Sequence, residues 1–132
     1  AASDVYKRQD TAAHKGCLES GGKTIAVVGS GLDSIYPKEN TKLQKDIIQS
    51  GGLILSEQPE GIKASPRTLI ARTRIQMAIA DKVIVVECER ESGTMHAVRF
   101  AQNFDKPIFA LDCDWSGNRY LIDNKIAKPF RI

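Results

Sequence analysis

Apolar residues follow two patterns along this sequence: short unbroken runs, and longer segments in which they recur every three or four positions. The unbroken runs end at glycine or polar residues and have the length of strands. They are TIAVVGSG (24–31), LILSE (53–57), KVIVVE (82–87) and KPIFALD (106–112). Because TIAVVGSG contains no alternation, it predicts a strand covered on both faces.

The segments between these runs have helical periodicity. We predict helices over 10–20, 40–52, 68–81 and 93–104, and a short helix followed by a terminal strand within 116–130. In the second helix we expect Leu43, Ile47 and Ile48 to face inward, with Lys42 and Lys45 on the solvated side. Strands that alternate with helices of this length predict an α/β fold, Rossmann-like and three-layered, with a mostly parallel sheet.

In such folds, ligands bind beyond the carboxyl ends of the strands, where loops lead into helix N-termini. This rule selects four loops as candidate sites: 29–40, 56–68, 87–94 and 111–118. Tyr36 and Trp115 are the aromatic residues near them, and either could stack on a base or simply pack.

Composition narrows the class of protein. A chain of 132 residues with 42% hydrophobic and 27% charged residues is typical of one soluble domain. No apolar run approaches the ~20 residues of a membrane span, so we expect a cytosolic protein without membrane contact. Cys17, Cys88 and Cys113 lack metal-ligand spacing, which predicts reduced thiols and no metal. The net charge of +3 is too small to identify a nucleic-acid partner.

Gly29-Ser30-Gly31 follows a predicted strand, as in dinucleotide-binding proteins. The third glycine of that motif is replaced by Ser34, and Tyr36-Pro37 interrupts the expected helix. We therefore interpret the turn as a general anion site and predict no cofactor.

Ser92-Gly93-Thr94 opens a predicted helix, whose free N–H groups and positive dipole end suit a phosphate. The alternative is that Ser92 only caps its own helix.

Arg72 and Arg74 lie two positions apart, which on a regular helix separates their side chains by about 200°. Either Arg72 precedes the helix, or one arginine contacts the ligand while the other pairs with a carboxylate such as Glu57 or Glu87.

Several of these segments together resemble the DprA/Smf family of bacterial DNA-processing proteins. The matching words, in order, are DTAAHKGCLESGGKTIAVVGSGLDSIYPKEN, LILSEQPEG, ARTRI, VIVVE, SGTMHAVRFA and SGNRYLI, which cover nearly everything from Asp10 onward. The resemblance implies a Rossmann-like domain that binds single-stranded DNA, forms a homodimer and helps to load the recombinase RecA during natural transformation, without catalysing a reaction.

On this resemblance Lys42, Arg72 and Arg74 look like strand-contacting or pocket-shaping residues, and Ser92-Gly93 matches the family's Ser-Gly at a helix start. With the two glycine-rich turns included, we predict a nucleic-acid-binding set of Gly29, Ser30, Asn40, Lys42, Arg72, Arg74, Ser92, Gly93 and Thr94. Thr73 departs from the family, which has asparagine between the two arginines.

The start of the chain departs further. SDVYKRQ resembles a translated sequencing adaptor, so we expect residues 1–9 to be a tag and 10–132 to be a partial domain without its first βαβ element.

Two other functions stay open. One is a nucleotide-binding enzyme of the LOG phosphoribohydrolase type, which shares a similar sheet; that family has Pro-Gly-Gly-x-Gly-Thr with a following glutamate, where this chain has ESGTMHAV. The other is a purely structural or dimerisation role.

Overall fold

The computed structural model describes residues 2–34 and 40–132, with side chains from residue 9 onward. The predicted interruption at Tyr36-Pro37 therefore lies outside the described residues. The chain divides into two compact units, Ala1–Arg72 and Thr73–Ile132, and the boundary falls inside helix α3 (Pro66–Ile79). No helix in the described part is both long and apolar enough to cross a membrane.

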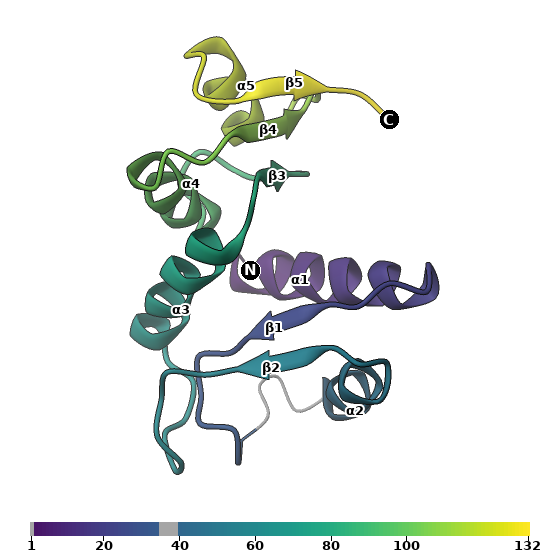
Figure 1. The fold of residues 1–132 in the computed structure, drawn as a ribbon. Helices are drawn as coiled ribbons and strands as arrows, with labels where there is room; N and C mark the ends of the chain where they lie inside the picture. Colours follow the sequence, from purple (N-terminus) through teal and green to yellow (C-terminus); the bar gives the residue numbers. More distant parts are fainter. Residues whose placement is uncertain (1, 35–39) are drawn as a thin grey trace. The chain divides into compact units, whose positions relative to one another are not determined.

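The first unit contains α1 (Ala2–Glu19), β1 (Ile25–Val27), α2 (Thr41–Gln49), β2 (Leu53–Leu55) and the start of α3 (Figure 1). Strands β1 and β2 are parallel and pair in register from Ile25 with Leu53 to Val27 with Leu55. Their apolar residues meet those of the two helices in a small core, made by Leu18, Ala26, Leu43, Ile47 and Ile54.

Two predictions of burial fail in this unit. Ile48 is 60% exposed, because Leu43 and Ile47 are four positions apart on the inner face of α2 and Ile48 is rotated about 100° from Ile47. Ile25 is 49% exposed, so β1 is covered on both faces only at Ala26 and Val27. Lys42 and Lys45 are exposed, as predicted.

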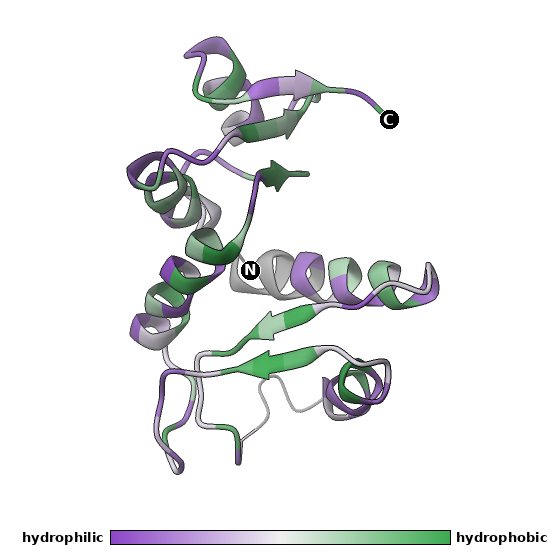
Figure 2. Cartoon of the chain, viewed as in Figure 1, coloured by the Kyte–Doolittle hydropathy of each residue, from purple (hydrophilic) through white to green (hydrophobic). Residues whose placement is uncertain are grey.

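The second unit contains the rest of α3, β3 (Val83–Val85), α4 (Thr94–Asn103), β4 (Ile108–Leu111), α5 (Ser116–Asp123) and β5 (Lys128–Phe130). Its strands pair in the order β3-β4-β5, and both pairings are parallel. Figure 2 shows the apolar strands β3 and β4 of this unit in green. The core joins β3 and β4 to the inner faces of α4 and α5 through Val85, Val98, Ala101, Ala110 and Leu121.

The parallel pairings confirm the predicted α/β class, and the predicted terminal strand is β5. Helix α1 begins at Ala2 and so continues into the residues that we predict to be a tag. Helix formation does not test the origin of those residues, and the tag stays a prediction.

Candidate nucleic-acid interface

The first part of the loop after β1, residues 29–31, is buried and tied to the loop after β2. Gly29 lies so close to α3 that a Cβ added to it would come within 3.2 Å of the Leu69 backbone nitrogen. The Ser30 hydroxyl donates to the Ser34 carbonyl at 2.9 Å, and the Ser30 carbonyl accepts from the Ser56 hydroxyl at 2.5 Å. Ser30 is 1% exposed, so its side chain organises the two loops from within. Through residue 34 this loop enters no helix, unlike a dinucleotide-binding turn.

Asn40 and Lys42 lie at the start of α2. Asn40 occupies the N-cap position, but its side chain makes no capping hydrogen bond and donates instead to the Thr11 hydroxyl at 3.1 Å. This contact ties α2 to α1. Lys42 is exposed, one position after the first residue of the helix. Of these two residues predicted to contact DNA, Lys42 therefore presents its charge to solvent, whereas the Asn40 side chain joins the start of α2 to α1.

Arg72 is held inside the first unit. Its guanidinium donates to the carbonyl of Val27, the last residue of β1, at 2.7 Å and pairs with Asp10 of α1 at 2.9 Å. Its Nε also donates to the Leu69 carbonyl at 3.3 Å, and the side chain is only 11% exposed. Three elements therefore meet on one guanidinium, and Asp10 is the carboxylate that the sequence did not identify.

Arg74 is the arginine that faces solvent. Both arginines lie within α3, so the alternative in which Arg72 precedes the helix is wrong. Thr73, between them, is 2% exposed. Arg72 belongs to the first unit, and Arg74 belongs to the second with Ser92, Gly93 and Thr94. That all of these residues contact the same DNA strand stays a prediction.

The N-termini of α3 and α4 differ in whether a side chain caps the helix. At α3, the Ser65 hydroxyl accepts from the Thr68 N–H at 3.3 Å while the Thr68 hydroxyl accepts from the Ser65 N–H at 2.8 Å, with Pro66 as the first helical residue. This reciprocal arrangement is a capping box, which satisfies the Thr68 N–H, and Pro66 has no N–H to satisfy.

At α4 the N-cap is Gly93, and no side chain caps the helix. The alternative in which Ser92 caps its own helix is therefore wrong. Ser92 directs its hydroxyl inward, where it finds no hydrogen-bond partner of normal geometry among the described residues and lies near the Cys88 thiol. The backbone N–H groups of Gly93 and Thr94 likewise have no acceptor in the described part of the chain. These amides are the donors that a phosphate could use.

The loops after β3 and β4 are joined by Asn118, which the sequence analysis did not single out. Asn118 is 0% exposed. Its amide nitrogen donates to the carbonyls of Val86 and Leu111 at 2.9 Å each, and its oxygen accepts from the Cys88 N–H at 2.9 Å. Gly117 packs beside it so closely that an added Cβ would lie 2.6 Å from the Cys88 carbonyl oxygen.

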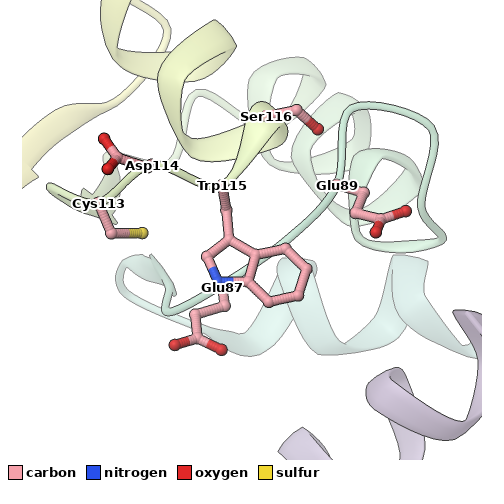
Figure 3. A pocket seen from close by; sticks show the side chains of 6 residues that line it. All are labelled: Glu87, Glu89, Cys113, Asp114, Trp115 and Ser116. Carbon is pink, nitrogen blue, oxygen red and sulfur yellow. The ribbon is translucent and has the colours of Figure 1, made fainter.

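An open pocket of about 480 Å³ lies beyond these two strand ends (Figure 3). Its lining consists of Glu87, Glu89, Cys113, Asp114, Trp115 and Ser116. Three of these residues are acidic and none is basic. In Figure 3 the indole of Trp115 lies between Glu89 on one side and Cys113 and Asp114 on the other. Carboxylates disfavour a phosphate, so this part of the predicted strand-end site has the wrong charge for DNA.

Cys88 and Cys113 stand at corresponding positions after β3 and β4. Cys88 is buried, while Cys113 is half-buried and lines the pocket. Burial, together with the neighbouring Cys113 thiol, raises the pKa of the Cys88 thiol to about 11, and the Ser92 hydroxyl offsets a part of this rise. Cys88 is therefore a protonated core residue at neutral pH.

Comparison with known proteins identifies the family. A sequence model described as DNA recombination-mediator protein A matches residues 9–131. The chain is 41% identical over 102 residues to protein Smf of Synechocystis, covering 77% of this chain and 25% of that protein. It is also 41% identical over 109 residues to DNA processing protein DprA of Streptococcus pneumoniae, covering 83% of this chain and 38% of that protein.

Solved structures agree with these sequence relatives. The X-ray structure of DprA from Streptococcus pneumoniae superposes with a TM-score of 0.83 and 37% identity, covering 92% of this chain and 44% of that one. DNA processing protein A from Helicobacter pylori, whose structure describes a single-stranded DNA binding mode, gives a TM-score of 0.76 and 34% identity, covering 80% and 50%. The chain therefore spans half or less of the length of these relatives. Because the family match includes nearly every residue, the chain belongs to the DNA recombination-mediator protein A family, which confirms the DprA/Smf resemblance.

Proposed function

We propose that this chain binds single-stranded DNA and protects it during DNA uptake, and that it assists the loading of RecA as a cytosolic homodimer without catalysing a reaction. The observation that carries the proposal is the likeness to the Helicobacter pylori protein, which is 34% identical over 80% of the chain and whose structure is described as giving insight into a single-stranded DNA binding mode. Nothing in the site favours the phosphoribohydrolase alternative.

The geometry favours particular contacts within this proposal. Lys42 and Arg74 present exposed charges for phosphates, and Gly93 and Thr94 present backbone N–H groups at the start of α4. Such contacts hold a strand without reading its sequence. Arg72 has a different role in this scheme, because its guanidinium already joins β1 and α1 to α3.

Fluorescence anisotropy of a labelled oligothymidine tests the proposal directly. The chain is expected to bind with an affinity that falls steeply as salt rises, since phosphate contacts release counterions. Lys42→Ala combined with Arg74→Ala is expected to weaken binding and to reduce the salt slope by roughly 1.4, at about 0.7 per lost contact. The control is Lys128→Ala, an exposed cation on β5. Equal affinity of the double variant and the wild type would refute the two contacts, and a chain that is folded but does not bind would refute the function.

A further inference from the structure

Two of the three cysteines stand at the same level of neighbouring strands, and the proposed DNA contacts use neither. In the pairing of β3 with β4, Val85 lies beside Ala110. Three further residues along each chain bring Cys88 opposite Cys113. Adjacent chains in a sheet lie about 4.8 Å apart, which is within the roughly 4.4–6.8 Å between Cα atoms that a disulfide spans.

Contacts beyond the strand ends keep these two chains together as they leave the sheet. The Asn118 side chain donates to the carbonyls of Val86 and Leu111, the next pair in this register, at 2.9 Å each. It also accepts from the Cys88 N–H at 2.9 Å. The Cys113 sulfur lies 3.9 Å from the Val86 carbonyl oxygen, so this thiol points toward the chain that carries Cys88. Burial and, after it, the Cys113 thiol raise the pKa of Cys88, which places the two thiols close together.

The two thiols differ in their access to a reagent. Cys113 is half-buried and lines the open pocket of about 480 Å³ (Figure 3), whereas Cys88 is 3% exposed. A small oxidant in solution therefore meets Cys113 first. Burial shields Cys88 from the reagent, and the reactive group within its reach is the neighbouring sulfur.

The surroundings of Cys88 leave room for its sulfur and supply a hydrogen-bond donor. Gly117 has no side chain, and a Cβ added to it would overlap the Cys88 sulfur. The Ser92 hydroxyl lies beside the same thiol and lowers its pKa against the larger effect of burial. A donor in this position stabilises the thiolate, which is the form of cysteine that attacks another sulfur.

We propose that Cys113 and Cys88 are the first and the resolving thiol of a peroxide-sensitive pair that closes into a disulfide. The Cys113 sulfur attacks one oxygen of hydrogen peroxide, the O–O bond breaks, and Cys113 becomes a sulfenic acid as water leaves. The Cys88 sulfur then attacks the Cys113 sulfur, the S–S bond forms, and the S–O bond breaks. The hydroxyl departs as a second water with the Cys88 proton. The two thiols lose two electrons in total, and the peroxide gains them.

This bond would tie the loops after β3 and β4 covalently, at the place where Asn118 already joins them by hydrogen bonds. In a reducing compartment such a bond is transient and is broken again by thiols. The inference is independent of DNA binding.

Peptide mass spectrometry of the folded chain after treatment with hydrogen peroxide tests the proposal. We expect a disulfide within one chain that joins Cys88 to Cys113 and leaves Cys17 as a thiol, and dithiothreitol should reverse it. The control is the same treatment in urea that unfolds the chain. There Cys17 should also enter disulfides, because the fold no longer selects the pair.

Single variants separate the two steps. Cys17→Ser should keep the bond. Cys113→Ser should abolish it and leave Cys88 as a thiol under the same exposure, because Cys88 is buried. In Cys88→Ser, Cys113 should stop at the sulfenic acid, which dimedone traps.

Three products of the folded wild-type chain would overturn the proposal. They are a bond from Cys17 to either of the other cysteines, a bond between two copies through Cys113 as the main product, and Cys113 oxidised beyond the sulfenic acid with Cys88 left as a thiol. These products are read from the wild-type chain, so the result does not depend on whether a variant folds.

Discussion

Replacing Asn118 with alanine tests whether one buried amide holds the loops after β3 and β4 together. The substitution removes two part-buried hydrogen bonds to carbonyls and a buried one from the Cys88 N–H, all made by a side chain that is 0% exposed. At about 1 kcal/mol for each hydrogen bond, the free energy of unfolding should fall by about 3 kcal/mol. With a urea m-value of about 2 kcal/mol/M, the unfolding midpoint should fall by about 1.5 M.

Asn124→Ala is the matched control, at the C-cap of the same helix. Its amide also donates a hydrogen bond, to the Tyr120 carbonyl at 2.8 Å, but it is exposed to water. We expect this variant to lose at most about 0.5 kcal/mol. The Asn118→Asp variant tests the donor role of Asn118 apart from its acceptor role, since the carboxylate still accepts from the Cys88 N–H but repels the two carbonyls. The destabilisation that this substitution causes should lessen at low pH as the acid becomes protonated. Equal midpoints for Asn118→Ala and Asn124→Ala would refute the reasoning.

Three further predictions concern the hydrogen bonds and ion pair of Arg72, the imidazole of His14 and the thiol of Cys88. Arg72→Ala should destabilise the first unit by about 2–3 kcal/mol, because the Val27 carbonyl and Asp10 lose their partner in a half-buried site, and urea unfolding measures this; a change below about 0.5 kcal/mol would contradict it. Burial, the largest cause, lowers the pKa of His14 below its usual 6.5, so the folded state binds the proton less well than the unfolded state and stability should fall as the pH drops below 6.5. Unfolding midpoints at pH 7.5 and 5.5 measure this loss, and a His14→Gln variant with the same pH dependence would argue against it. The raised pKa of Cys88 predicts that iodoacetamide at pH 8 modifies Cys113 much faster, as read by peptide mass spectrometry; equal rates would show that Cys88 is accessible.

Local patterns predicted the elements of this fold because strand and helix preferences depend on nearby residues. The unbroken run at 82–87 contains β3, and the periodic segment at 93–104 contains α4. The predicted and observed ends differ by one or two residues. Strand direction also followed, since strands joined through helices pair in parallel. The inward position of Ile48 was wrong because the apolar face of α2 is narrower than its composition indicates.

The partners of individual side chains could not be predicted in this way. Arg72 meets Asp10 and Val27 across 62 and 45 positions of sequence, and Asn118 meets Cys88 across 30. Such contacts depend on the register of the sheet, which local propensity does not set. The words ARTRI and SGNRYLI marked these places by resemblance, but they did not show that the residues bind backbone groups of the chain itself.

Backbone amide shifts of a ¹⁵N-labelled chain, titrated with oligothymidine, test the central claim most directly. The account predicts saturable shifts at the Gly93 and Thr94 amides and near Lys42, with weaker shifts as salt rises and little change at Asp114. Shifts confined to the loop of Asp114 and Trp115, with Gly93 and Thr94 unmoved, would contradict it.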